Sequence, residues 1–286
     1  MRLLVFGFGY AARALARRLA PQGWQVAATV RDAAEVARLA AQGVDAIPID
    51  QGDRLAQALA ATDALLVTAP PGPQGCPALP LLVPAMARAG AFPDWIGYLS
   101  TTGVYGDRRG GWVFETSRLA AQSVEGARRV AAERGWLEVG RGMGLTVTAF
   151  RLPGIYGPGR SALDRLRAGE ARSIAAPGQV FSRIHVDDLA AGLEASMARP
   201  RAGGIYNLCD DAPAPNGEVV AYAAGLLGVA PPPVVALADA GLSLAAQRFY
   251  AESKRVSNAR AKAELGWRPA YPTYREGLQA VLAAER

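Results

Sequence analysis

Short apolar segments alternate with segments that carry helix signals along the first half of the chain. The apolar segments have the length of strands, and they cover residues 3–6, 25–30, 44–49, 64–69, 95–99 and 146–150. The helix signals between them cover residues 11–20, 32–43, 53–60 and 124–134. Because the return between two parallel strands needs a crossover outside the sheet, this alternation predicts a parallel sheet with helices on both faces.

The pattern changes after Arg151. Gly and Pro become frequent, for example at Pro153, Gly154 and Gly157, and the alternation of strands and helices weakens. We therefore predict a smaller second lobe in this part of the chain. One later apolar segment, residues 204–208, is predicted to return to the main sheet.

A glycine-rich turn connects the first predicted strand to the first predicted helix. It reads GFGYAA, begins at Gly7, includes Tyr10 and fits the pattern G-x-G-x-x-A. Gly7 would make the tight turn, Gly9 would let the backbone approach a pyrophosphate, and Ala12 is small enough for the helix to pack closely on the strand. The N-terminus of the helix would then offer N–H groups to the phosphates. The turn predicts a dinucleotide site.

The turn and the alternation together predict an α/β fold, a Rossmann-type doubly wound parallel sheet with a small C-terminal substrate lobe. We assign residues 1–152 and 179–208 to the dinucleotide-binding domain. Residues 153–178 and 209–286 are assigned to the small lobe, which would bind the substrate.

The cofactor preference depends on the end of the second predicted strand, which reads TVRD. The guanidinium of Arg31 suits the 2′-phosphate of NADP, and Asp32 then caps the next helix. In the competing interpretation Asp32 binds the ribose hydroxyls of NAD and Arg31 is a surface residue. We favour NADP, with NAD as the second choice. Asp50, after the third strand, is placed to meet the adenine end, although it can equally cap a loop.

Composition limits the classes of protein that fit. The chain has 286 residues, of which 51% are hydrophobic, so a disordered chain is excluded. Its two cysteines cannot form a four-cysteine zinc site or a disulfide-dense scaffold, and they suit a reduced, cytoplasmic compartment. His185 is the only histidine, which excludes a multi-histidine site, and we predict no metal.

The net charge of +6 comes almost entirely from arginine. The basic residues are scattered, acidic residues lie between them, and no long run of like charges occurs, so we predict no nucleic-acid partner. Part of the charge would suit a small ligand that carries phosphate. Residues 64–87 are uncharged, but prolines interrupt them and no membrane-spanning helix is expected.

Several further motifs follow in order. They are STTGVYG (100–106), RLPGIYGPG (151–159), FSRIHVDDLA (181–190), IYNLCDD (205–211) and SKRVSNARAKAELGWRP (253–269). With these motifs and GFGYAA, nearly the whole chain resembles the extended and atypical branches of the short-chain dehydrogenase/reductase superfamily. Members of these branches are often called NAD-dependent epimerase/dehydratase proteins.

The resemblance implies a hydride transfer to or from a nicotinamide, assisted by three side chains. A Ser or Thr, here matched by Thr101, would hydrogen-bond the substrate oxygen. A tyrosine would transfer the proton. A lysine four residues later would lower the pKa of the tyrosine, ordinarily about 10, and would hold the nicotinamide ribose.

The sequence departs from that pattern on the helix QSVEGARRVAAE, residues 122–133. If Glu133 matches the acid that usually follows, Glu125 occupies the tyrosine position and Arg129 the lysine position. Arg129 can still hold ribose hydroxyls, but it does not titrate. Three alternatives remain. Glu125 replaces the base, a tyrosine on a loop (Tyr105 or Tyr156) supplies the proton, or the protein binds NADP without catalysis. Tyr105 can also simply pack beneath the cofactor.

These observations predict an NADP-binding oxidoreductase or epimerase of the atypical extended short-chain dehydrogenase type, which acts on a small or nucleotide-linked substrate in the cytoplasm. The alternative is a non-catalytic NADP-binding sensor or scaffold. The resemblance also suggests a homodimer. His185, Asp187 and Asp188 are expected to fix the backbone and a helix N-terminus, and Cys209 to be a buried, inert thiol.

Overall fold

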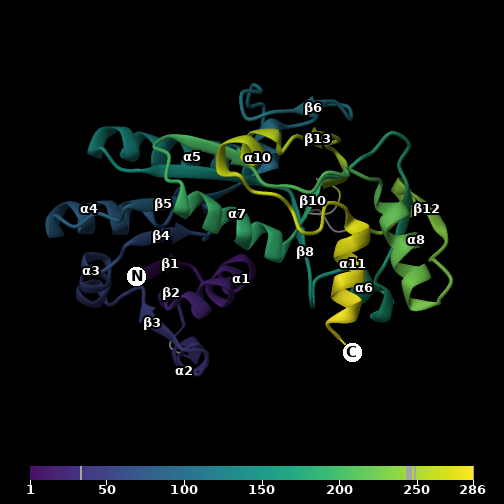
Figure 1. Ribbon diagram of the computed structural model, residues 1–286. Coiled ribbons are helices and arrows are strands. Elements are labelled where there is room, and N and C mark those ends of the chain that lie inside the picture. The colour runs from purple at the N-terminus through teal and green to yellow at the C-terminus, as the bar shows by residue number, and fades with distance from the viewer. Residues whose placement is uncertain (33, 243–246, 248, 286) are drawn as a thin grey trace. The chain divides into compact units, whose positions relative to one another are not determined.

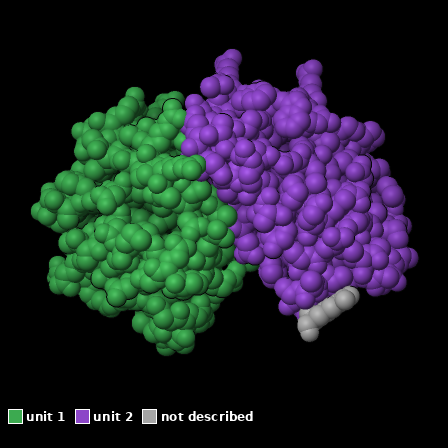
Figure 2. Space-filling model, viewed as in Figure 1, with its two compact units in different colours: residues 1–101, 124–151, 190–206 green, residues 102–123, 152–189, 207–286 purple. Residues whose placement is uncertain are grey.

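The computed structural model describes residues 1–32, 34–242, 247 and 249–285. The chain forms two compact units, shown as a ribbon in Figure 1 and coloured separately in Figure 2. Unit 1 comprises residues 1–101, 124–151 and 190–206, and unit 2 comprises residues 102–123, 152–189 and 207–286.

The borders at 151/152 and 206/207 lie within two residues of the predicted ones, but two segments differ. Residues 102–123 and 179–189, predicted for the dinucleotide-binding domain, belong to unit 2. The first segment is held there by backbone hydrogen bonds from Arg108 and Gly110 to the Ser253 carbonyl. Residues of the second segment pair with the strand at 154–156.

Unit 1 is built on a seven-stranded sheet with the order β11-β7-β5-β4-β1-β2-β3. The strands are β1 (Arg2–Phe6), β2 (Gln25–Val30), β3 (Val44–Pro48), β4 (Ala64–Val67), β5 (Trp95–Thr101), β7 (Val147–Leu152) and β11 (Gly204–Asn207). β1 pairs in parallel with β2 and β4, β2 with β3, and β4 with β5. The direction of strand addition reverses between β1 and β4, which is where doubly wound sheets bind ligands. The predicted fold class is confirmed.

Helices connect these strands. They are α1 (Tyr10–Leu19), α2 (Ala34–Ala40), α3 (Gly52–Ala60), α4 (Leu79–Ala89), α5 (Val124–Met143) and α7 (Val186–Ala198). The sequence analysis missed α4, which contains Pro84 within a proline-rich segment. Side chains such as Leu4, Leu65 and Ile96 are fully buried in the core between strands and helices. Within the described ranges, no helix is long and apolar enough to cross a membrane.

Unit 2 contains three two-stranded parallel sheets and several helices. The sheets pair β8 (Gly154–Tyr156) with β10 (Arg183–His185), β9 (Ser173–Ala175) with β12 (Val234–Ala236), and β6 (Trp112–Val113) with β13 (Arg255–Val256). Its longer helices are α6 (Ala162–Arg167), α8 (Asn216–Leu227), α10 (Ala259–Leu265) and α11 (Tyr274–Ala283). Apolar side chains from α6, α8 and α11 form a second core.

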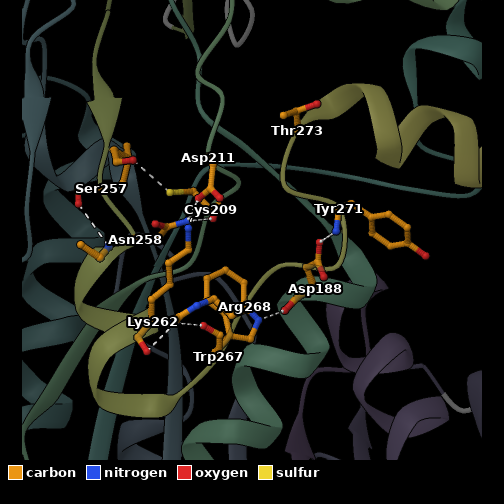
Figure 3. A network of polar contacts seen from close by, with 12 residues as sticks. Asp188, Cys209, Asp211, Ser257, Asn258, Lys262, Trp267, Arg268, Tyr271 and Thr273 are labelled. Atoms are coloured by element: carbon orange, nitrogen blue, oxygen red, sulfur yellow. Dashed lines mark hydrogen bonds and ion pairs between the residues drawn. The ribbon is translucent and has the colours of Figure 1, made fainter.

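A polar network docks the C-terminal segment of unit 2 (Figure 3). The Asp188 carboxylate accepts hydrogen bonds from the backbone N–H of Ala270 at 2.6 Å and of Tyr271 at 3.0 Å. Trp267 Nε1 donates to the Asp188 carbonyl at 3.1 Å. His185 Nδ1 accepts from the Asp187 N–H at 3.3 Å. Asp188 therefore fixes the backbone at residues 270 and 271, as the sequence analysis expected of this residue.

Gly97 on β5 is predicted to be intolerant of any side chain. A Cβ there would lie 2.2 Å from the ring of Trp95, and that ring is buried, with its Nε1 donating to Ser196 Oγ at 3.0 Å. We expect Gly97→Ala to lower the free energy of unfolding by about 1–3 kcal/mol, measured by urea denaturation. The control is Gly142→Ala on α5, where a Cβ would meet no described atom within 4 Å outside the adjoining helix backbone, and a gain of up to about 1 kcal/mol is expected. Equal stability of Gly97→Ala and the parent protein would contradict this account.

Candidate functional site

Gly7 forms the turn at the end of β1. Its φ of +88° lies in the left-handed region that favours glycine. Its N–H donates to Thr29 Oγ1 at 3.0 Å, and its carbonyl accepts from Thr68 Oγ1 at 2.6 Å. A Cβ at this position would also lie 3.3 Å from Ala69. The turn is therefore fixed by neighbours on β2 and after β4, and only glycine fits it without strain.

Gly9 precedes the first residue of α1, Tyr10, and leaves the end of that helix accessible. A Cβ built on Gly9 would meet no atom within 4 Å. Among the described residues no side chain caps α1, and the first turn of this helix contains no acidic residue. Ala12 is fully buried where α1 packs on the sheet. The N-terminus of α1 therefore combines a partial positive charge with space beside the backbone, as a phosphate group requires.

The ends of β2 and β3 place three charged side chains at the surface. Asp32 Oδ1 accepts from the Ala34 N–H at 2.9 Å, at the start of α2, as expected of a capping residue. Arg31 is exposed, and within the described part of the chain its guanidinium has no ion-pair partner. Asp50 is exposed in the turn after β3. Arg31 is thus the cation available near the end of β2.

Thr101 and Arg129 lie near the end of β5. Thr101 is the last residue of the strand and is partly buried. Arg129, one helical turn after the exposed Glu125 on α5, donates a hydrogen bond from Nη1 to the Leu99 carbonyl. Burial raises the pKa of the nearby Tyr98 hydroxyl, and the adjacent Arg129 charge offsets part of that effect. Arg129 therefore anchors α5 to β5, and only some of its five N–H donors remain for a ligand.

A buried ion pair supports this end of the sheet. Glu133 on α5 and Arg151 on β7 form a salt bridge in which each side chain is only 3% exposed. Arg151 Nε lies 3.2 Å from both carboxylate oxygens, and Ser100 Oγ donates to Glu133 Oε2 at 2.9 Å. The sequence analysis used Glu133 only to align the helix and missed this network. The arginine inside the buried strand segment VTAFRL is the feature of the sequence that could have indicated a buried ion pair.

Tyr105 and Tyr156, the two candidate proton donors, were expected on loops but end a 3-10 helix (Thr102–Tyr105) and strand β8, both in unit 2. Tyr105 is fully buried, and its hydroxyl donates to Asn207 Oδ1 at 2.7 Å. Its hydroxyl is therefore already engaged within unit 2. The hydroxyl of Tyr156 is buried without a hydrogen-bond partner among the described residues. Burial raises the pKa of Tyr156, and the charge of Asp210 raises it further, so this phenol stays protonated.

Asp210 follows β11 and was not singled out from the sequence. It is buried, and neither carboxylate oxygen has a hydrogen-bond partner in the described ranges. Burial raises its pKa to about 8, and the neighbouring Arg183 counteracts only part of this effect. Cys209 beside it is also buried, its Sγ donates to the Val256 carbonyl at 3.2 Å, and burial raises the pKa of its thiol.

Glu133→Ala is predicted to destabilise the protein strongly, because it leaves the Arg151 charge buried without its partner. We expect a loss of about 3–5 kcal/mol in the free energy of unfolding, measured by guanidinium denaturation. The matched control is Glu35→Ala, which breaks the Glu35–Arg38 pair, whose side chains are 44% and 46% exposed, and should cost less than about 1 kcal/mol. Similar losses in the two variants would contradict the importance of burial.

Asp210→Asn is predicted to change the pH dependence of stability. An unfolded Asp ionises near its ordinary pKa of 3.8, whereas folded Asp210 holds its proton up to about pH 8. The folded state therefore binds more protons in this window, and its stability decreases as pH rises through it. The variant lacks this loss. Its stability relative to the parent should improve by more than about 1 kcal/mol between about pH 5 and about pH 9. A pH-independent difference between the two urea midpoints would refute this.

Comparison with known proteins places the chain in a family. The model of the NAD-dependent epimerase/dehydratase family matches residues 81–209. Protein YeeZ of Escherichia coli strain K12 is 31% identical over 288 aligned residues, which cover 95% of this chain and 96% of that protein. A conserved protein of unknown function from Silicibacter pomeroyi has a similar structure, with a TM-score of 0.91 and 46% identity over 99% of this chain and 98% of that one.

A structure of more distant sequence shares the fold. It is the Thermus thermophilus UDP-glucose 4-epimerase in complex with NAD, with a TM-score of 0.77 and 20% identity over 99% of this chain and 98% of that one. The motifs, the sheet order and these matches agree. The chain belongs to the NAD-dependent epimerase/dehydratase family.

Proposed function

We propose that this chain is an NADP-dependent oxidoreductase or epimerase that acts on a small or nucleotide-linked substrate. The observation that carries the proposal is the turn from β1 to α1. The helix end is uncapped by side chains, and the space beside Gly9 is open. A dinucleotide pyrophosphate fits such an end because it takes hydrogen bonds from the backbone N–H groups and interacts favourably with the helix dipole.

The choice of NADP rests on Arg31. Its exposed guanidinium follows β2, where it can pair with a 2′-phosphate in a charge-assisted hydrogen bond. Asp32, the residue that would instead bind the ribose hydroxyls of NAD, accepts a hydrogen bond at the start of α2. The Thermus epimerase was solved with NAD, which supports a nicotinamide dinucleotide and leaves NAD as the second choice.

Three side chains would serve the reaction, with a fourth as the alternative for the proton transfer. The nicotinamide, when bound, supplies or accepts the hydride. Thr101 at the end of β5 would orient the substrate oxygen, and Arg129 would hold the nicotinamide ribose with donors that do not contact Leu99. The exposed carboxylate of Glu125 would take up the substrate proton as a general base. Tyr105 is a weaker candidate for the proton transfer, because its hydroxyl already donates to Asn207.

A non-catalytic NADP-binding sensor or scaffold is the second candidate. It is favoured by Glu125 and Arg129, which would occupy the catalytic tyrosine and lysine positions of the family pattern if Glu133 matches the acid that follows them, and by the bond that commits Arg129 to β5. For either function we propose the cytoplasm as the compartment, because Cys76 and Cys209 are both free and buried. Assembly into homodimers stays a prediction.

The purified protein should bind NADPH more tightly than NADH when nicotinamide fluorescence is followed in separate titrations. Arg31→Ala should weaken NADPH binding about tenfold or more and leave NADH binding unchanged, because only NADPH carries the 2′-phosphate. Arg38→Ala is the control, since Arg38 is an exposed arginine on α2 paired with Glu35. A preference for NADH would transfer the ribose contact to Asp32, and binding of neither cofactor would refute the proposed function.

A further inference from the structure

Unit 2 contains a cavity of about 530 Å³ that lies entirely within it. This volume falls in the range of small-molecule sites. Strands β8 and β10 and helices α6, α8 and α11 contribute to its lining. The walls include four aromatic side chains, those of Tyr156, Phe181, Phe249 and Tyr274. Such walls suit a flat apolar group, which can contact their faces and edges.

The charged side chains of the cavity are mostly cationic. Arg160, Arg165 and Arg183 line it, against two carboxylates, Asp164 and Glu170. The Asp164 carboxylate is already committed, because it accepts hydrogen bonds from the backbone N–H and the hydroxyl of Ser161 at the start of α6. The cavity therefore carries a net positive charge and favours an anion.

Arg183 is held in place by the backbone. Its Nη1 donates to the Phe181 carbonyl at 2.8 Å and to the Ala214 carbonyl at 3.0 Å. A guanidinium oriented in this way loses little side-chain entropy when it binds an anion, which increases the affinity it can provide.

Most neutral hydrogen-bonding groups of the lining are engaged within the protein. Ser182 Oγ accepts from the Val256 N–H at 3.0 Å, and Asn216 Nδ2 donates to the Arg172 carbonyl at 3.2 Å. The Tyr156 hydroxyl is not open to the cavity, because it is buried against Gly277 of α11, where an added Cβ would lie 1.9 Å from the oxygen. The cavity thus offers cations and aromatic walls, with few donors and acceptors for a sugar or a base.

We propose that this cavity binds a small aromatic anion, a carboxylate or phosphate attached to a flat ring. Its arginines bind the charged group, and the aromatic walls, including the ring of Tyr156, contact the flat ring of the ligand. That such an anion is the substrate rests on the proposed function, whereas its binding to unit 2 does not require the cofactor.

Isothermal titration of the full chain near neutral pH, without cofactor, tests the proposal. The probes are 4-hydroxycinnamate, phenyl phosphate, the neutral 4-hydroxycinnamyl alcohol and UDP-glucose. We expect at least one aromatic anion to bind, and the stronger of the two identifies the charged group. The alcohol should bind about tenfold more weakly than 4-hydroxycinnamate if the carboxylate is preferred, and UDP-glucose more weakly than the better anion in either case.

Two variants test the assigned side chains. Tyr156→Phe, which keeps the ring that lines the cavity, should leave the affinity unchanged, whereas Arg165→Gln should weaken binding of the better anion about fivefold to tenfold, in line with the loss of a charge contact. The matched control is Arg167→Gln on the same helix, because Arg167 pairs with Glu285 and does not line the cavity. Its affinity should be unchanged.

The proposal is overturned if neither aromatic anion binds, if UDP-glucose binds more tightly than both, or if Arg165→Gln and Arg167→Gln bind alike. The NADPH titration separates the two proposals. Binding of NADPH without binding of an aromatic anion refutes only the cavity assignment. Binding of the anion without binding of either nicotinamide cofactor refutes only the proposed function.

Discussion

The buried contact between Glu133 and Arg151 joins the three elements on which the candidate site of unit 1 depends. Glu133 lies on α5, Arg151 on β7, and Ser100, which donates to Glu133, on β5. A charge in this position is costly unless its partner is present, so the pair links helix and strands in one arrangement. Thr101 follows Ser100 directly, and Arg129 lies one turn before Glu133. The network of Glu133, Arg151 and Ser100 therefore helps to position Thr101 and Arg129.

The part of that site proposed to bind the dinucleotide depends on the geometry of the parallel sheet. Parallel strands bring their carboxyl ends to one edge, and the strand order reverses between β1 and β4. Gly7 lies at this reversal, and Thr68, which follows β4, donates a hydrogen bond to the Gly7 carbonyl. The Gly7 turn leads into the accessible end of α1, while Arg31 leaves β2 at the same edge. An anionic cofactor would thus meet a helix dipole and a guanidinium that come from consecutive strands.

Unit 2 is organised by polar contacts as much as by apolar packing. Asp188 holds the backbone at Ala270 and Tyr271, and Asn207 accepts from Tyr105, so distant segments are tied together. Tyr156 and Asp210 are exceptions, because the described structure provides no hydrogen-bond partner for either side chain. Buried polar groups without partners are uncommon in proteins and concentrate where ligands bind or protons move. Both groups stay protonated near neutral pH, because burial raises their pKa values, so neither places an unpaired charge in the interior.

The glycine-rich turn, the parallel sheet and the capping role of Asp32 could be predicted from sequence, because the turn and the cap depend on backbone geometry within a few residues and the sheet on the alternation of strand and helix segments. The membership of residues 102–123 in unit 2 could not, since it depends on bonds from Arg108 and Gly110 to Ser253, far along the chain. The same holds for the burial of Tyr105, whose hydroxyl bonds a residue 102 positions away.

The sequence by itself determined the fold class, the dinucleotide turn and the departure at Glu125 and Arg129. Only the tertiary structure decided which polar groups are satisfied, that Arg129 bonds β5, and that three arginines and Tyr156 line one cavity. The physical reason is that local conformation is dictated by neighbouring residues, whereas burial, pKa and hydrogen-bond partners depend on segments that meet only in the folded chain.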